Sequence, residues 1–193
     1  AARDAASIAS TGVPDGLAQG GLWDRDAAGN ELQWTGAERP VHTQDGASHN
    51  VAIKQTKSKA ILNWDTFNVG RDTTVEFQQN STDAVLNRVV GAETKPSQIL
   101  GAIKGDGTVM LVNQNGVIFT GSSQVNVRNL IVAAGAITDN QFANNGIYVN
   151  ASGSQPTLTD ALGVVEVESG AQITTHKPTS STDDGGYVML LGK

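Results

Sequence analysis

The sequence predicts an all-β protein folded as a β-solenoid, in which short strands stack coil upon coil. Three observations point to this class. Apolar runs of a few residues recur from residue 60 onward, and Gly or Asn closes most of them. These residue types suit tight bends because they tolerate positive φ. The unit of strand, polar turn and strand repeats at roughly 20 residues, a periodicity typical of stacked coils.

The amino-acid composition excludes several classes of function. The 193 residues include no Cys, which rules out disulfides, thiolate zinc sites and cysteine nucleophiles. Asp and Glu total 19 against 13 Lys and Arg, so a broad basic face for nucleic acid is not expected. The length favours a single domain, 1–193. We expect this domain to be a monomer. No apolar run approaches the roughly 20 residues that cross a bilayer, and the composition favours an exported bacterial protein.

Residues 1–59 are expected to form an N-terminal cap. Two short apolar stretches, which contain Trp23 and Trp34, flank a polar segment with a turn signal at 29–30. This arrangement predicts a β-hairpin in which the two Trp side chains pair across the strands. Lone exposed Trp side chains would instead indicate sugar or partner binding.

Residues 35–50 are expected to form a loop, 51–53 a short strand, and 60–193 the coils. At about 20 residues a coil, the last part predicts about six or seven coils. Its β-rich runs are 60–64, 74–77, 84–91, 98–103, 108–113, 116–119, 124–127, 129–134, 163–168, 171–174 and 186–191.

The two ends of such a solenoid differ. Open strand edges recruit other chains, so natural solenoids cover their ends. The cap would cover the first coil, whereas the sequence stops at 191–193 directly after a strand-like run. We therefore expect the chain to be an N-terminal fragment of a longer β-helical protein.

The stretch 61–138 carries the most specific pattern. Its motif positions are Asn63, Trp64, Phe67, Asn68, Gly70, Asn87 and Arg88, followed by the turn Asn113, Gln114, Asn115 and Gly116. This order resembles the haemagglutination-activity, or two-partner secretion, domain of the filamentous haemagglutinin family of large exoproteins. The family usually has Asn-Pro-Asn-Gly at the turn. Gln114 cannot preset φ as Pro does, but Asn115 and Gly116 can still supply the positive-φ positions.

The resemblance implies a right-handed parallel β-helix with an antiparallel N-terminal cap and extra β-hairpins. It also implies that the domain is a secretion signal without a cofactor. The periplasmic polypeptide-binding domains of a partner outer-membrane β-barrel transporter would recognise it, after removal of a signal peptide. An adhesin-like exoprotein would then reach the surface or medium of a Gram-negative bacterium and fold there, with this domain nucleating the β-helix.

Each motif residue also has a structural interpretation. The Asn side chains at the run edges could face the transporter or cap turns through hydrogen bonds to the backbone. They are Asn63, Asn68, Asn87, Asn113, Asn115 and Asn126. Arg88 shares a face with Leu86 and would point either inward to an anionic or carbonyl partner or outward to solvent. Trp64 and Phe67 are expected in the core.

Two other functions remain open. An adhesion module would bind polysaccharide or host glycans through exposed aromatics. A carbohydrate-active β-helix enzyme would need clustered carboxylates, but Glu166 and Glu168 are expected to form only a solvated face. His42, His49 and His176 are scattered, and a metal site at the first two would need further ligands brought in by the fold. We therefore expect no catalytic and no metal site.

Overall fold

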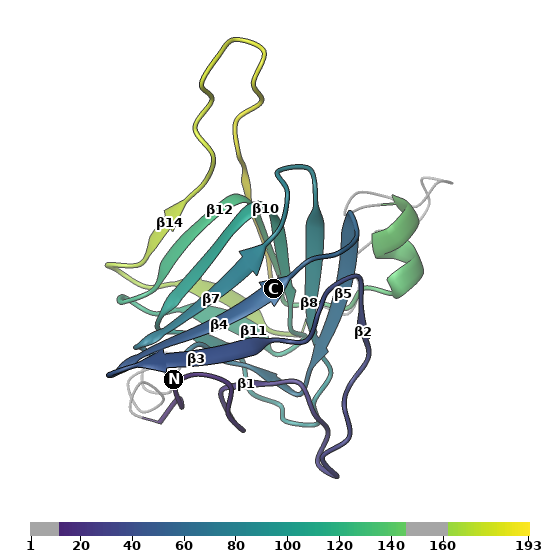
Figure 1. Cartoon of the computed structure of the whole chain (residues 1–193), viewed down its shortest axis with the longest axis vertical. Helices are drawn as coiled ribbons and strands as arrows, with labels where there is room; N and C mark the ends of the chain where they lie inside the picture. Colours follow the sequence, from purple (N-terminus) through teal and green to yellow (C-terminus); the bar gives the residue numbers. More distant parts are fainter. Residues whose placement is uncertain (1–11, 146–161) are drawn as a thin grey trace.

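The computed structural model describes residues 12–145 and 162–193 (Figure 1). This part of the chain is a right-handed parallel β-helix with an antiparallel cap, as the sequence predicts. Its one helical element is a single π-turn, η1 (Gln141–Asn145). Residues 1–11 of the expected cap lie outside the described residues.

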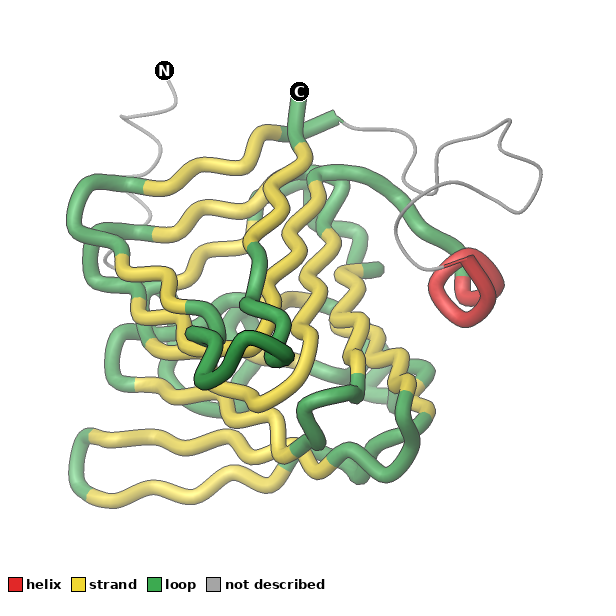
Figure 2. Tube along the Cα trace, turned by 90° about the horizontal axis from the view of Figure 1, so that it is seen from above, coloured by secondary structure: helices red, strands yellow, loops and turns green. Residues whose placement is uncertain are grey.

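Three stacks of parallel strands form the faces of the β-helix (Figure 2). The first face contains β4 (Ser48–Lys54), β7 (Thr73–Gln78), the first half of β10 (Ala102–Val112), the first half of β12 (Gln124–Ala133) and β14 (Gln172–Thr174). The second contains β5 (Lys59–Trp64), β8 (Ala84–Val89), the second halves of β10 and β12, and β15 (Val188–Leu191). The third contains β9 (Ser97–Ile99), β11 (Gly116–Phe119) and β13 (Val164–Val167).

An antiparallel strand covers each face of the first coil. Strand β3 (Val41–Asp45) pairs with β4, β2 (Trp34–Thr35) pairs with β5, and β1 (Leu22–Trp23) pairs with β6 (Thr66–Phe67). Parallel stacking would otherwise leave unpaired backbone groups along this edge. The expected covering of the first coil by the N-terminal region is thus confirmed for the described residues.

The expected pairing of Trp23 with Trp34 is wrong. A turn does form between them, with Gly29 at φ 85° and a short bridge from Arg25 to Glu31. The two Trp strands then diverge to different faces, because each satisfies a separate open edge of the first coil. Trp34 packs edge-on against Trp64, with ring centroids 5.0 Å apart.

The expected loop at 35–50 is also wrong, because it contains β3 and the start of β4. All five residues of β3 are exposed, so selection for burial leaves no apolar alternation in its sequence. The sequence of an edge strand whose two sides are both exposed to solvent resembles that of a polar loop.

The structure has about four coils, not six or seven. Two segments leave the solenoid and consume residues without adding coils. One is the segment 134–145 after β12, and the other is the long excursion between β14 and β15 at the top of Figure 1. A constant repeat length was therefore the wrong assumption.

Two apolar clusters lie on opposite sides of the second face. The main core fills the solenoid and includes Trp64, Phe67, Leu111 and Phe119. The second cluster lies outside the sheet, where outward-facing residues such as Leu86 pack beneath the segment 134–145. Because both sides are buried, strands of this face read as continuous apolar runs rather than alternations.

The core is closed at one end and open at the other. In the first coil, inward-facing Val51 and Leu62 are fully buried beneath the cap. In the last coil, the inward-facing positions are occupied by Val167, Val188 and Leu190, each paired with a buried residue of the preceding coil. These three side chains are nevertheless 43%, 45% and 42% exposed. No described segment covers this end of the solenoid.

Candidate functional site

The motif positions do not form one exposed patch. Trp64 and Phe67 are core residues with 0% and 1% exposure, as predicted, and their rings pack edge-to-face with centroids 5.2 Å apart. They hold the first coil against the cap, since Trp64 also touches Trp34. They therefore offer no platform for a ligand.

Asn87 takes neither of the roles predicted for it. It is 0% exposed and points into the solenoid rather than capping a turn or facing a partner. Its side-chain oxygen accepts a hydrogen bond from Trp64 Nε1 at 3.0 Å, and its amide donates to the Met110 carbonyl at 3.3 Å. A buried indole N–H needs such an acceptor, so Asn87 allows Trp64 to occupy the core.

Arg88 lies on the outer side of the second face, neither in the core nor free in solvent. Its Nε donates to Asn63 Oδ1 at 3.1 Å, and Nη1 donates to the Ile137 carbonyl at 3.0 Å. Its Nη2 lies 2.7 Å from Asp139 Oδ1. It therefore has an anionic and a carbonyl partner, but on the outer side of the sheet rather than inward as one of the two interpretations predicted.

The same cluster reaches the cap. Gln33 Nε2 donates to Asp139 Oδ2 at 2.7 Å, and Asn63 donates to Gln33 Oε1 at 3.3 Å. The hydrogen bond from Gln33, followed by that from Arg88, lowers the pKa of Asp139 against the opposing effect of burial. One polar cluster thus joins the cap, the first two coils and the segment 134–145.

The turn at 113–116 forms as predicted. The Gly116 N–H donates to the Asn113 carbonyl at 2.9 Å, and Gly116 has a φ of 111°. Asn113 Oδ1 accepts from the Asn115 N–H at 3.0 Å, and its amide donates to Ser97 Oγ at 3.1 Å. Asn113 is 2% exposed, so this residue caps the turn, while Gln114 is exposed.

Asn68 and Gly70 tie the third face to the cap. Asn68 Oδ1 accepts from the Gln98 N–H at 2.8 Å, and its amide donates to the Gly20 carbonyl at 2.9 Å. A Cβ on Gly70 would lie 2.3 Å from Asp15 Oδ1, so only Gly lets the two segments approach. Both motif residues thus have structural partners.

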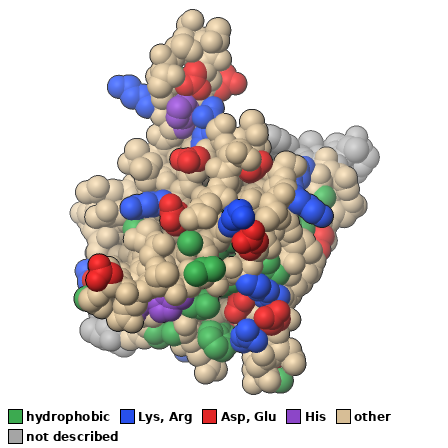
Figure 3. Space-filling model, in the orientation of Figure 1, with side chains coloured by type: hydrophobic (Ala, Val, Ile, Leu, Met, Phe, Trp, Pro, Cys, Tyr) green, Lys and Arg blue, Asp and Glu red, His purple; other side chains and the backbone are tan. Residues whose placement is uncertain are grey.

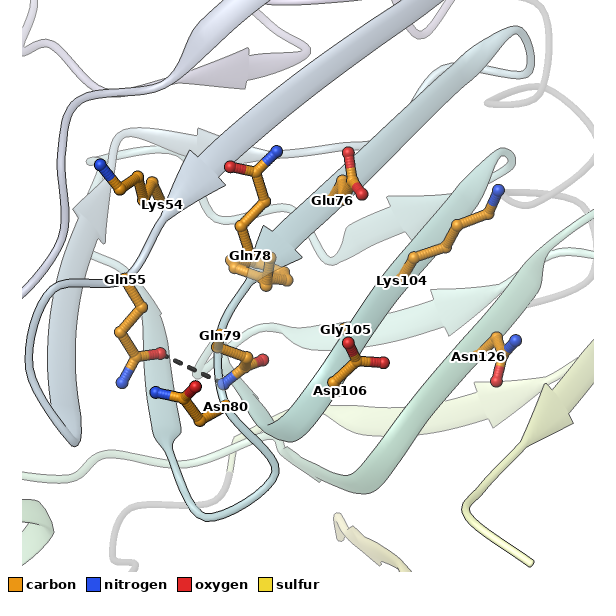
Figure 4. Close-up of a pocket in the computed structure, with 11 residues that line it drawn as sticks. Lys54, Gln55, Glu76, Gln78, Gln79, Asn80, Lys104, Gly105, Asp106 and Asn126 are labelled. Atoms are coloured by element: carbon orange, nitrogen blue, oxygen red, sulfur yellow. Dashed lines mark hydrogen bonds between the residues drawn. The ribbon is translucent and has the colours of Figure 1, made fainter.

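A polar groove of about 630 Å³ lies on the outer side of the first face (Figure 4). Side chains of opposite charge alternate along it, namely Lys54, Glu76, Lys104 and Asp106. Its aromatic lining residue, Phe77, is only 3% exposed. The groove therefore presents charges and amides without a ring on which a sugar could stack.

The excursion between β14 and β15 is held by Asp183. This carboxylate accepts from the Thr179 N–H at 3.0 Å, lies 2.8 Å from His176 Nε2, and lies 3.4 Å from Arg128 Nη2. The Thr179 hydrogen bonds and His176 push its pKa far below the usual range for a carboxyl. These contacts fix the base of the excursion to β12.

The two carboxylates considered for catalysis, Glu166 and Glu168, differ in their surroundings. Glu166 is half-buried in β13, whereas Glu168 follows the strand and accepts a hydrogen bond from the Gly121 N–H at 2.9 Å. Both carboxylates are half-buried rather than fully solvated, and Glu168 lies one residue past the end of β13. Among the described residues, no group of three or more His, Cys, Asp or Glu side chains is placed to hold a metal ion.

Sequence reasoning missed the segment 134–145 as a cover. Ile137 and Phe142 are 4% and 5% exposed and pack on the second face. The only signal was a pair of apolar residues in a polar stretch. That signal is too short to show periodicity.

The capped β-helix has the fold of a solved bacterial secretion domain. The family model for the TPS secretion domain matches residues 28–193. The chain belongs to this family of two-partner secretion domains. TPS exoproteins are secreted across the outer membrane of Gram-negative bacteria with a partner transporter, and the family is not a known enzyme family.

Curated relatives match only part of the chain. A heme/hemopexin-binding protein of Haemophilus influenzae is 40% identical over 92 residues, which is 47% of this chain and 10% of that protein. The corresponding protein of strain ATCC 51907 is 36% identical over 83 residues, or 42% of this chain and 9% of that protein. The matched region thus spans about a tenth of these relatives.

A solved structure supports the fold. The HMW1 secretion domain from Haemophilus influenzae superposes with a TM-score of 0.58 at 21% identity, covering 81% of this chain and 37% of that one. In the described part of the chain, no helix is long and apolar enough to cross a membrane.

Proposed function

We propose that this chain is the segment through which a longer, adhesin-like exoprotein is recognised for export and begins to fold. The match of residues 28–193 to the secretion-domain family carries the proposal. The partner would be an outer-membrane β-barrel transporter whose periplasmic domains bind this segment. The exported protein would then be released or remain at the cell surface.

The open end of the solenoid supports a role in folding. Val167, Val188 and Leu190 leave an apolar core layer half-exposed, while the cap closes the opposite end. A following coil would bury this layer and pair with the free edges of β13, β14 and β15. Growth would therefore proceed in one direction, from a domain that is already capped.

The division into cap and coils fits this proposal. The strands β1, β2 and β3 would close the solenoid, and the strands from β4 onward would supply the coils on which later sequence stacks. Asn63, Asn68, Asn87 and Arg88 would serve export indirectly, by holding the cap, the coils and the covering segment in one arrangement.

The experiment that tests export is a deletion of residues 61–138 from the full-length protein, in cells with and without the partner transporter. We expect loss of the protein from the medium and surface, at unchanged levels of the transporter. Normal export of the deleted protein would overturn the proposal.

Direct recognition is testable by calorimetry with the periplasmic domains of the transporter. The 193-residue chain would be titrated in its folded form. In a second titration it would be used in its unfolded form, directly after dilution from denaturant. Binding at micromolar or tighter affinity to either form is expected. The difference between the two forms identifies the state that is recognised, and no binding to either contradicts the proposal.

The polar groove favours a second candidate, binding of a charged polysaccharide on the first face. Lys54 and Lys104 would contact anionic groups of such a ligand. Binding on glycan arrays that is lost in a Lys54→Gln/Lys104→Gln variant would support this candidate, whereas a blank array would remove it.

A further inference from the structure

Strand β3 forms the outer edge of the ten-stranded sheet at the capped end. The strand order ends β7–β4–β3, and all five residues of β3 are exposed. Figure 2 shows β3 as the outermost strand of its hairpin, and Figure 3 shows histidine atoms (purple) at the surface over this hairpin. The other two cap strands, β1 and β2, have only two residues each. Within the described ranges, β3 therefore offers the longest strand edge at this end.

Hydrogen bonds fix which backbone groups of β3 point outward. In an antiparallel pair, hydrogen-bonded residue pairs alternate with pairs that exchange no hydrogen bond. The His49 N–H donates to the Asp72 carbonyl at 2.8 Å, away from β3, so His49 and its partner Gln44 form a pair of the second kind. By alternation, Thr43 bonds to β4, while His42 and Gln44 direct their N–H and C=O groups away from it.

The N-terminal arm covers one side of the hairpin but not its edge. A Cβ at Gly16 would lie 2.4 Å from His42 Nε2, and this ring nitrogen lies 2.9 Å from His49 Nδ1. The arm thus meets side chains of the hairpin, and the Gly16 N–H donates to Thr73 Oγ1 rather than to β3. In the part of the chain that the structure describes, no segment pairs with the outward backbone groups of β3.

The strand lacks the features that usually protect a sheet edge. Natural edge strands carry Lys, Pro or a β-bulge, which block the addition of another strand. Strand β3 reads Val-His-Thr-Gln-Asp and pairs with β4 in continuous register. Its only Asp, Glu, Lys or Arg is Asp45, at the end of the strand. An edge of this kind can accept a further strand by main-chain hydrogen bonding.

We propose that two copies of the chain associate cap to cap, through antiparallel pairing of their β3 strands about a twofold axis at Thr43. This register places His42 opposite Gln44 of the second copy, so the outward N–H and C=O groups of both residues find partners. Thr43 lies opposite itself, which is a favourable cross-strand pair, and Asp45 lies opposite Val41. No like charges meet, so the strand is complementary to itself, as a twofold contact requires.

The contact is expected to be weak and to depend on concentration. A pair of five-residue strands buries less surface than a stable dimer needs. The net charge of -6 on each copy also opposes association. The dilute chain would therefore be the expected monomer. Pairing at the caps leaves both open ends free, so it goes beyond the proposed function without blocking the stacking of later coils.

The test is sedimentation velocity and ¹H–¹⁵N NMR of the 193-residue chain, from about 10 µM to about 1 mM at physiological ionic strength. We expect dimers at the upper concentrations and slower amide exchange at His42 and Gln44 as the concentration rises. Thr43, which already bonds to β4, should change little. A chain that stays monomeric throughout would overturn the proposal. Protection that appears at β13, β14 and β15 instead would also overturn it, because the contact would then lie at the open end.

Two substitutions that add the same charge test the register. Val41→Lys would place a lysine opposite Asp45 of the second copy and should tighten association about two- to tenfold. Thr43→Lys would place two lysines opposite each other and should weaken association by about the same factor. Both sites are exposed, and NMR spectra of the dilute variants establish that the hairpin still forms. Equal effects of the two substitutions would overturn the proposal.

A third substitution tests the backbone groups directly. Gln44→Pro removes an outward N–H and keeps the bonds to β4, so it should weaken association at least about tenfold. The Val188→Asp/Leu190→Asp variant, changed at the open end, should associate like the parent chain. Undiminished association of the Gln44→Pro variant would show that the copies do not pair through β3.

Discussion

Asn87 takes its role from a partner in the preceding coil. By sequence it stands inside an apolar run, where a polar residue suggests a surface or a turn. In the structure it accepts the Trp64 indole N–H in a fully buried position. The pairing lets the largest core side chain be buried without an unsatisfied donor.

Replacing Asn87 with Ala should therefore lower the free energy of unfolding by about 1–3 kcal/mol, since the Trp64 N–H and the Met110 carbonyl lose their partner. Urea denaturation followed by Trp fluorescence measures it. The matched control is Asn126→Ala, on the exposed side of β12, which should change stability by less than about 0.5 kcal/mol. Equal effects of the two substitutions would contradict the assignment.

Asp139 makes the stability of the covering segment depend on pH. Its pKa is lowered in the folded state, chiefly by the Gln33 hydrogen bond and then by Arg88. A lowered pKa means that the carboxylate stabilises the fold above its unfolded pKa of about 3.9 and loses this contribution as the pH falls through the folded value.

The prediction is a pH-dependent difference between the parent chain and Asp139→Asn. The parent should be more stable above about pH 5, and the difference should shrink as the pH falls below about 4. Unfolding free energies measured from pH 7 to pH 3 test it. A double-mutant cycle with Gln33→Ala supplies the control, because the two substitutions should not be additive. A difference that is constant with pH would show that Asp139 makes no such contribution.

The segment 134–145 acts as an added layer on the second face. It buries Leu86 and Met110, which face away from the solenoid interior, and it is held by Arg88 through the Ile137 carbonyl and Asp139. A helix or loop of this kind converts an exposed apolar sheet face into a second core.

Phe142→Ala should detach this layer without unfolding the solenoid. Removing a buried Phe side chain costs about 3 kcal/mol. This cost exceeds the free energy of local unfolding that we expect for so short a segment. We expect faster hydrogen exchange across 134–145 and unchanged protection in β7 and β10. Val41→Ala, at an exposed site on β3, is the control. Global loss of protection would indicate that the layer and solenoid fold as one unit.

At the scale of the whole molecule, the difference between the two ends is the main feature. The three antiparallel strands of the cap close one end, and half-exposed inward-facing residues mark the other. The half-exposed layer is an apolar surface that fits the proposed stacking of further coils.

A Val188→Asp/Leu190→Asp variant should block stacking of later coils. In the 193-residue chain its cost should be small, about 1–2 kcal/mol, because both side chains are already half-exposed. In a longer form of the protein, sequence after residue 193 should lose its resistance to protease. Val41→Asp, an exposed apolar site at the capped end, should leave that resistance intact. Resistance in both variants would mean that later coils do not use this end.

The amino-acid sequence by itself determined the class of fold, the strand runs of the coils, the burial of Trp64 and Phe67, the turn at 113–116 and the family. These features depend on side-chain alternation, on Gly and Asn at bends and on local motif order, all of which act over a few residues.

Only the tertiary structure determines on which face each polar residue lies and which residues it contacts. Trp64 and Asn87 are 23 residues apart, Arg88 and Ile137 are 49 apart, and the register of the stacked coils alone brings them together. The same holds for β3, whose exposed sequence carries no strand pattern, and for the two histidines that it aligns with β4. Contacts between coils depend on the length of every intervening excursion. A repeat length read from the sequence cannot supply those lengths.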